Sequence, residues 1–159
     1  MNAATTAMRP QDQLVAFSLD EQRYALALAT VERVVRAVEI TPLPKAPEIV
    51  SGVINIQGRV VPVINVRKRF RLRERDVAPS DQIIVARTST RTVALMVDAA
   101  NGVVECPAER FVSAASVVPR MEYVTGVAKL DDGLILIHDL ESFLSLEEAR
   151  SLDDAMENA

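Results

Sequence analysis

Short apolar segments separated by polar turns recur along the chain, a pattern typical of β-hairpins. Residues 14–28 and 83–97 each consist of an apolar segment, a polar turn and a second apolar segment. Residues 52–66 and 126–140 have the same arrangement, and their turns contain glycine, which accepts a positive φ at little cost. Many of the apolar positions are Val and Ile, which favour strands. The pattern therefore predicts four hairpins and an all-β fold.

The four hairpins form two repeats in the same order. Residues 14–28 align without gaps on 83–97, at an offset of 69 residues, and residues 52–66 align on 126–140, at an offset of 74. The five additional residues fall in the connection between hairpins, where insertions are tolerated. Chance similarity between single hairpins is common, but two pairs in the same order favour an internal duplication.

The duplication predicts how the chain is divided. We expect a flexible tail over residues 1–12, a β domain over 13–145 with approximate halves 13–80 and 81–145, and a C-terminal helix and tail over 146–159. Short sheets with tight turns close readily into small barrels. A half of about 65 residues buries only about 60% of its unfolded surface. We therefore expect the two halves to pack on each other and fold together.

Helix signals are sparse and mark short segments. Pro47 predicts the first position of a short turn that ends at Gly52, and residues 107–111 predict a similar turn. Ser145 with Glu148 three residues later has the spacing of a capping box, which predicts the beginning of the C-terminal helix.

The charge balance and the cysteine content restrict the possible partners. The chain has 18 basic and 22 acidic residues, a net charge of −4, which argues against a surface for nucleic-acid phosphates. We interpret its one basic run, residues 67–73 with Arg75 close behind, as a solvated strand end or a protein-contacting edge, with anion binding as the alternative. A single cysteine excludes an intrachain disulfide, and no segment has the pattern of a signal peptide or a membrane helix. We expect a cytoplasmic protein without direct membrane insertion.

No group of residues has the composition of an active site. His138 is the only histidine, and we interpret it as a strand-end histidine beside Asp139. Cys106 is interpreted as a small buried hydrophobe, and Asp131-Asp132 as part of a hairpin turn rather than an acid-base pair. The five glycines do not form a phosphate-binding loop. We therefore predict no catalytic, cofactor-binding or metal-binding residues, and a protein that works by presenting a surface.

Several motifs follow one another in an order that matches a known family. They are Leu43-Pro44, Pro47, residues 52–58 (GVINIQG), residues 62–67 (PVINVR), residues 94–98 (ALMVD) and residues 126–135 (GVAKLDDGLI). These motifs resemble the CheW family of coupling proteins of bacterial chemosensory arrays. Family members typically have Gly-Val-x-Asn-Leu-Arg-Gly and Pro-Val-x-Asp-Leu-Arg at the corresponding places. The resemblance covers about residues 13 to 145.

The resemblance implies two tandem SH3-like five-stranded β-barrels packed together, with short helices and a C-terminal helix. It also implies a non-enzymatic adaptor that couples the cytoplasmic hairpin tip of a chemoreceptor to the regulatory domain of a CheA-type histidine kinase, within membrane-associated receptor arrays. Two alternatives stay open: a coupling protein of a non-flagellar pathway that controls pili or another output, and a small-barrel nucleic-acid-binding protein. The residues that contact the kinase, and whether the first strand crosses into the other barrel, also stay open.

The resemblance implies a receptor-binding region in the first half of the chain. Its residues would be Leu28, Val31, Arg33, Val34, Gly52, Asn55 and Gln57. Arg33 stands where an acidic residue is common in the family, Gln57 where arginine is usual, and Asn65 where aspartate is usual. In relatives the first two positions can pair as opposite charges, whereas a cation and a neutral amide cannot. We expect a receptor tip of acidic or neutral character, against the alternative of neutral drift at an exposed site.

Overall fold

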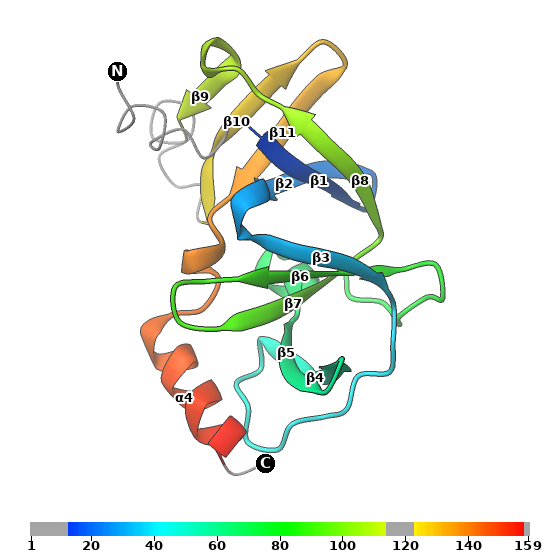
Figure 1. The fold of residues 1–159 in the computed structure, drawn as a ribbon, viewed down its shortest axis with the longest axis vertical. Helices are drawn as coiled ribbons and strands as arrows, with labels where there is room; N and C mark the ends of the chain where they lie inside the picture. The colour runs from blue at the N-terminus through cyan, green and yellow to red at the C-terminus, as the bar shows by residue number, and fades with distance from the viewer. Residues whose placement is uncertain (1–12, 114–122, 158–159) are drawn as a thin grey trace.

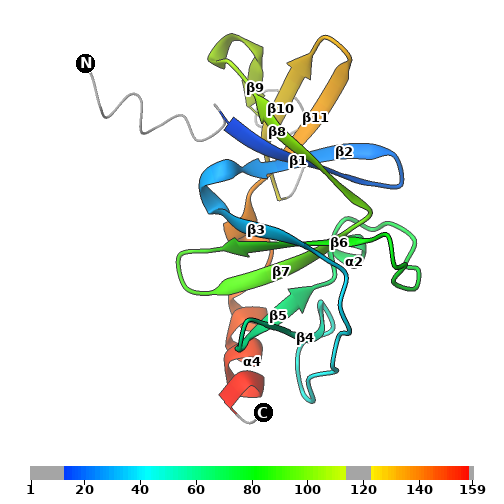
Figure 2. The same ribbon diagram turned by 45° about the vertical axis from the view of Figure 1, so that its right-hand side comes forward.

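The fold consists of two β-barrels stacked along the long axis of the molecule, with a C-terminal helix beside the lower one (Figures 1 and 2). The computed structural model describes residues 13–113 and 123–157. Barrel I has the strand order β8-β1-β2-β11-β10-β9, and barrel II has the order β3-β6-β7-β5-β4. The all-β class predicted from the sequence is confirmed.

The strands of barrel I are β1 (Gln13–Leu19), β2 (Gln22–Ala27), β8 (Ala99–Glu105), β9 (Phe111–Ser113), β10 (Val124–Leu130) and β11 (Gly133–His138). Those of barrel II are β3 (Val31–Arg36), β4 (Val50–Ile56), β5 (Arg59–Ile64), β6 (Gln82–Arg87) and β7 (Thr92–Val97). The helical segments are η2 (Leu28–Thr30), α2 (Val66–Arg69), η3 (Ala108–Arg110), η4 (Leu140–Ser142) and α4 (Leu146–Glu157).

The two repeats exchange their first hairpins between the barrels. Hairpin β1–β2 belongs to barrel I, with the strands of the second repeat, and hairpin β6–β7 belongs to barrel II, with the strands of the first. The halves 13–80 and 81–145 therefore do not build one barrel each. The exchange is made by two equivalent parallel pairings, of Ala25 with Ile137 and of Ala94 with Val63. Such long-range pairings leave no local pattern in the sequence, which is why the question stayed open there.

The two repeats are alike down to single residue pairings between strands, but the two barrels differ by one strand. Val112 of β9 pairs with Val127, and at the equivalent place in barrel II Thr41 pairs with Val53 as an isolated bridge. Barrel II therefore has the expected five strands. Barrel I has six, because the segment that makes one bridge in barrel II forms a short strand there.

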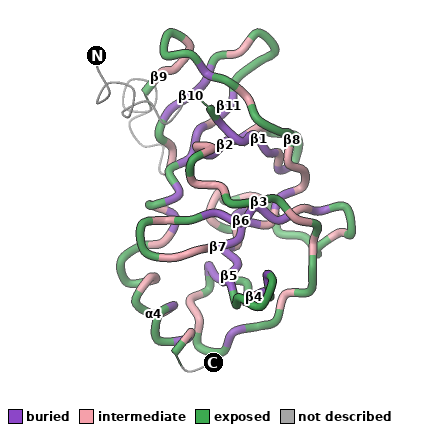
Figure 3. The backbone as a smooth tube through the Cα atoms, viewed as in Figure 1, coloured by how far each residue is buried: buried purple, intermediate pink, exposed green. Residues whose placement is uncertain are grey.

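Each barrel encloses a core of equivalent residues. The core of barrel I contains Leu14, Ala16, Ala25, Cys106, Ala128, Ile135 and Ile137, and that of barrel II contains Ile54, Ile56, Val61, Val63, Ile83, Val85 and Ala94. Six of the seven barrel I residues have their repeat equivalent in the other core. A third cluster joins the barrels and includes Phe17, Leu26, Leu95 and Phe143. Buried positions gather in the barrels and between them, whereas β3 is exposed along most of its length (Figure 3).

Helix α4 begins with the predicted capping box and packs on the shared cluster. The Ser145 hydroxyl accepts a hydrogen bond from the Glu148 N–H at 3.0 Å, and the Glu148 carboxylate accepts one from the Ser145 N–H at 2.8 Å. Leu152 and Ala155 are buried against both barrels' shared core. Leu146, the first residue of α4, is 71% exposed. In the described part of the chain no helix has the length and apolar character needed to cross a membrane.

Candidate functional site

The seven residues expected at the receptor-binding region all lie on or next to barrel II. Leu28 is in η2, three residues are on β3, two are on β4, and Gln57 is in the turn between β4 and β5. Strands β3 and β4 are the two edges of the same sheet. An ion pair from Glu32 of β3 to Arg59 of β5 brings the β3 edge to the β4–β5 hairpin, with 2.8 Å between Oε2 and Nη2. This ion pair connects the β3 part of the region to the β4–β5 hairpin.

The exposure of the seven residues separates surface positions from supporting ones. Arg33, Val34, Asn55 and Gln57 are exposed. Leu28 and Val31 are half-buried, and Gly52 is buried. A partner can contact the four exposed side chains directly. Gly52 can affect the surface only by the position of its backbone.

Gly52 is required for a close approach of two chain segments. A Cβ at this position would overlap the Thr41 carbonyl oxygen and lie 2.8 Å from Ile40 Cγ2. Its φ of +153° is also disfavoured for other residues. The equivalent Gly126 has the same role in barrel I, where a Cβ would lie 2.5 Å from Phe111 and from the Val112 carbonyl oxygen. The two glycines thus allow the same backbone crossing in both barrels.

Asn55 and Gln57 shape the hairpin at the end of this surface. The Asn55 side-chain oxygen accepts a hydrogen bond from the Gly58 N–H at 2.8 Å. Gln57 and Gly58 have φ values of +51° and +88°, as a two-residue turn between Ile56 and Arg59 requires. Asn55 therefore stabilises the turn, and the Gln57 side chain extends from it into solvent.

The charge pair at this surface differs from the one that sequence reasoning considered. The side chains that form the ion pair are Glu32 and Arg59. Glu32 is next to Arg33 in the sequence, and Arg59 is two residues after Gln57. Thr92 Oγ1 also lies 3.4 Å from the Glu32 carboxylate. The hydrogen bond from Arg59 lowers the pKa of Glu32 from its ordinary value. Among the described residues, Arg33 and Gln57 form no ion pair or side-chain hydrogen bond. This ion pair was not predicted from the sequence. The signal that could have indicated it is the opposite charge of Glu32 and Arg59, which lie close in sequence to Arg33 and Gln57.

A pocket of about 160 Å³ adjoins the same region at the junction of the barrels. Ala27 and Thr30, on either side of the Leu28 segment, line it together with Thr125 and residues 137–141. Most of its accessible wall is apolar, so it offers a place for an apolar side chain of a partner. This pocket could not be predicted from the sequence, because its two walls come from different repeats.

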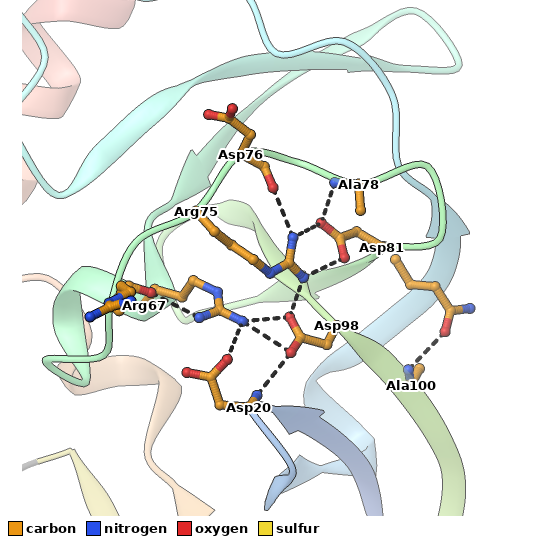
Figure 4. Close-up of polar contacts among 10 residues, drawn as sticks. Asp20, Arg67, Arg75, Asp76, Ala78, Asp81, Asp98 and Ala100 are labelled. Carbon is orange, nitrogen blue, oxygen red and sulfur yellow. Dashed lines mark hydrogen bonds and ion pairs between the residues drawn. The ribbon is translucent and has the colours of Figure 1, made fainter.

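Arg67 and Arg75 of the basic run form ion pairs inside the molecule (Figure 4). Arg67 Nη2 lies 2.8 Å from Asp98 and 2.9 Å from Asp20, and Arg75 Nη2 lies 2.6 Å from Asp98 and 2.7 Å from Asp81. Asp98 follows β7, where the chain leaves barrel II for barrel I, and Asp20 lies in the β1–β2 turn of barrel I. The run is therefore neither a solvated end nor an anion site at these positions, but a clamp between the barrels.

The pKa values of the clamp agree with this arrangement. Burial by itself raises the pKa of Asp98, but hydrogen bonds from Arg67 and from the Asp20 N–H outweigh it and hold the pKa below its ordinary value. The hydrogen bond to Asp20 contributes most to raising the pKa of Arg67, whose side chain is 11% exposed. These groups stay charged near neutral pH.

Replacing Asp98 by Asn tests the clamp. We expect the free energy of unfolding to fall by about 2 kcal/mol, because two partly buried arginines lose the carboxylate that they share. Denaturant unfolding at neutral pH measures the change. Asp131→Asn is the control: this carboxylate pairs with Arg110 but is 92% exposed, so its loss should cost less than about 0.5 kcal/mol. Equal losses in both variants would contradict the clamp.

Asn65, which stands where the family usually has aspartate, still caps a helix. Asn65 Oδ1 accepts a hydrogen bond from the Lys68 N–H at 3.0 Å and so caps α2. Its Nδ2 donates to Glu74 at 2.8 Å, a bond that an ionised aspartate cannot make. This departure from the family pattern is therefore compatible with the fold.

His138 is a buried residue at the end of β11. It is 6% exposed, its Nδ1 lies 2.9 Å from the Tyr123 carbonyl oxygen, and its ring stacks on Phe70 at 4.1 Å. Burial lowers its pKa to about 4, so the ring is neutral near pH 7. In the described residues no cluster of three or more His, Cys, Asp or Glu could hold a metal ion.

Comparisons with known proteins agree along nearly the whole chain. The family model for the CheW-like domain matches residues 13–148. The chemotaxis protein CheW of Thermotoga maritima is 32% identical over 133 residues, covering 83% of this chain and 87% of that protein. CheW of Treponema pallidum is 27% identical over 148 residues, covering 89% and 87%. The crystal structure of the scaffolding protein TtCheW from Thermoanaerobacter tengcongensis superposes with a TM-score of 0.78 at 32% identity, covering 87% of this chain and 95% of that one. The chain belongs to the CheW-like family.

Proposed function

We propose that this protein is an adaptor that couples chemoreceptors to a CheA-type histidine kinase in a chemosensory array. The observation that carries the proposal is the match to the CheW-like domain over residues 13–148, with the two-barrel fold of a CheW scaffolding protein. The ionisable residues support an adaptor rather than an enzyme, since the only histidine is buried and neutral. The site of action would be the cytoplasmic face of membrane-associated receptor arrays.

Titration calorimetry with the regulatory domain of a CheA kinase from the same organism tests this function. We expect saturable one-to-one binding, since a coupling protein must hold the kinase directly. Absence of binding to every such kinase of the organism would contradict the proposal and leave the fold as it is. The output of the array, whether flagella, pili or another process, then follows from which kinase binds.

The nucleic-acid alternative has little support in the structure. Three arginines of the basic run, Arg67, Arg69 and Arg75, are held by carboxylates of the same chain. Binding of phosphates requires cations that are free to replace counterions. The internal ion pairs therefore count against a nucleic-acid surface at this run.

We further propose that the receptor tip binds at the surface formed by Leu28, Val31, Arg33, Val34, Gly52, Asn55 and Gln57. The exposed Val34, with the apolar pocket beside η2, would receive apolar side chains of the receptor helices. Arg33 would pair with a carboxylate of the tip, because it has no ion pair among the described residues. Charge at such an interface determines specificity and association rate more than affinity.

The double substitution Arg33→Glu with Gln57→Arg tests this surface. We expect binding of the cognate receptor tip to weaken by about tenfold or more, because a carboxylate would replace the cation that the tip faces. Binding to the kinase should be unchanged, which also shows that the variant is folded. Lys129→Gln on the exposed part of β10 changes the net charge equally and is the control. Undiminished receptor binding by the double variant would show that the departure from the family pattern at positions 33 and 57 is neutral.

A further inference from the structure

A second pocket, outside the proposed receptor surface, lies at the junction of the barrels next to the end of α2. Its volume is about 300 Å³, and its wall includes Tyr24, Arg69, Phe70, Arg71, Tyr123 and His138. We call it the aromatic pocket. Tyr24 and His138 come from barrel I, and residues 69–71 come from the end of α2 and the segment after it. The pocket thus lies where both barrels contribute side chains.

Two residues that line this pocket, Arg69 and His138, each have a buried polar atom without a partner. Among the described residues, the buried side-chain nitrogen and oxygen atoms without a hydrogen-bond partner are Arg69 Nε and His138 Nε2. Buried polar atoms in folded proteins are almost always paired. That both exceptions belong to residues of one pocket indicates a site whose partner is a ligand.

The hydrogen bonds around the two atoms define what the ligand must offer. His138 Nδ1 faces the Tyr123 carbonyl oxygen at 2.9 Å, and a carbonyl only accepts, so Nδ1 carries the proton. The neutral ring therefore presents Nε2 as an acceptor, which needs a donor such as a hydroxyl. Arg69 Nε is a donor, and the terminal nitrogens of this arginine are already bound to the Tyr123 hydroxyl and to Glu148. The ligand must bring one donor and one acceptor.

The charge and the rings of the pocket wall indicate a ligand that has an anionic group and an aromatic ring. The side chain of Arg71 is exposed and has no ion pair among the described residues, and its backbone is held at a φ of +62°. It is the cation available to an anion entering the pocket. Tyr24 and Phe70 have ring centroids 5.1 Å apart, and Phe70 also stacks on His138. The Tyr24 ring beside Phe70 suits a planar aromatic ligand.

We propose that the aromatic pocket binds a small hydroxylated aromatic carboxylate. His138 Nε2 and Arg69 Nε are both buried, so binding moves the half-buried Phe70 side chain aside, and the ligand hydroxyl then donates to Nε2 in the plane of the imidazole ring. The carboxylate pairs with Arg71 and accepts a hydrogen bond from Arg69 Nε. The protein would then respond to an aromatic metabolite at the barrel junction, away from the proposed receptor surface on β3 and the β4–β5 hairpin.

Titration with 4-hydroxybenzoate tests the proposal, followed by NMR of protein labelled on its tyrosine rings. The chain has two tyrosines, Tyr24 and Tyr123, and both line the pocket, so every tyrosine signal reports on it. We expect saturable shifts of both, with a Kd of about 0.1 to 1 mM for a ligand of this size. Benzoate lacks the hydroxyl and phenol lacks the carboxylate, and each should bind about tenfold more weakly. Absence of shifts, or equal binding of the three probes, would overturn the proposal.

Two variants identify the contacts. Arg71→Gln should weaken 4-hydroxybenzoate about tenfold, whereas Arg73→Gln, an equal charge change at an exposed residue outside the pocket wall, should leave the affinity unchanged. His138→Phe removes the acceptor, so 4-hydroxybenzoate should then bind no better than benzoate does. If Arg71→Gln binds 4-hydroxybenzoate as tightly as the parent protein, the assignment of this pocket is wrong.

Discussion

Gly52→Ala is expected to lower the free energy of unfolding by about 3 kcal/mol, from steric overlap and backbone strain together. The added methyl group would overlap the Thr41 carbonyl oxygen and lie 2.8 Å from Ile40 Cγ2. A carbonyl of the backbone cannot move aside as a flexible side chain can. The bridge between Thr41 and Val53, which connects this segment to β4, would have to open or shift. Denaturant unfolding followed by circular dichroism measures the loss.

Gly58→Ala is the matched control for this prediction. Gly58 also has a positive φ, +88°, but a Cβ there would meet nothing within 4 Å. Its substitution should therefore cost only the backbone strain, about 1 kcal/mol. If the two variants lose equal stability, the close approach at Gly52 is not the cause.

The Gly52 result also bears on the proposed receptor surface. Gly52 is buried, so weaker receptor binding by a Gly52 variant would report a displaced β4 edge rather than a lost contact. The exposed Arg33 and Gln57 are the positions at which a loss of binding can be assigned to the interface itself. Measurements of stability and of binding on the same variants separate the two effects.

Lowering the pH from 7 to 5 is expected to destabilise the protein by about 2 kcal/mol through His138 alone. The unfolded chain binds this proton with a pKa of about 6.5, and the folded chain only with a pKa of about 4, because burial disfavours the charged ring. Protons therefore favour the unfolded state below pH 6.5. The stabilisation is fully present above that value and is lost as the pH falls towards 4, where the total reaches about 3 kcal/mol. Urea unfolding at several pH values measures the slope.

His138→Phe tests the assignment of this pH dependence. The chain has a single histidine, so the variant should lose most of the slope between pH 7 and 5. Phenylalanine can occupy the same stack with Phe70 and Tyr24. The Tyr123 carbonyl oxygen keeps a partner, because it also accepts a hydrogen bond from the Asp139 N–H at 2.8 Å. An unchanged slope in the variant would show that another group carries the acid sensitivity.

Many positions of the family motifs support the fold rather than a partner. Gly52 permits a chain crossing, Asn55 stabilises a turn, Asn65 caps α2, and Arg67 with Asp98 joins the barrels. The motifs were therefore sufficient to predict the family and the architecture. They were much less informative about which side chains meet a partner, because a motif records both kinds of constraint together.

The sequence alone determined the local elements of this protein. Short apolar segments rich in Val and Ile predicted the strands, glycines predicted the hairpin turns, and Ser145 with Glu148 predicted the beginning of α4, because each depends on neighbours along the chain. The repeat also predicted that both barrels would be built alike, and their cores consist of equivalent residues.

The tertiary structure alone decided how these elements combine. The exchange of hairpins, the Glu32–Arg59 pair, the Arg67–Asp98 clamp and the aromatic pocket all join residues far apart in the sequence. Each hairpin pairs its own two strands locally, whereas its outer edges pair with strands far along the chain, and both repeats offer equivalent edges. Only the packing of both barrels around the shared cluster of Phe17, Leu95 and Phe143 selects between these partners.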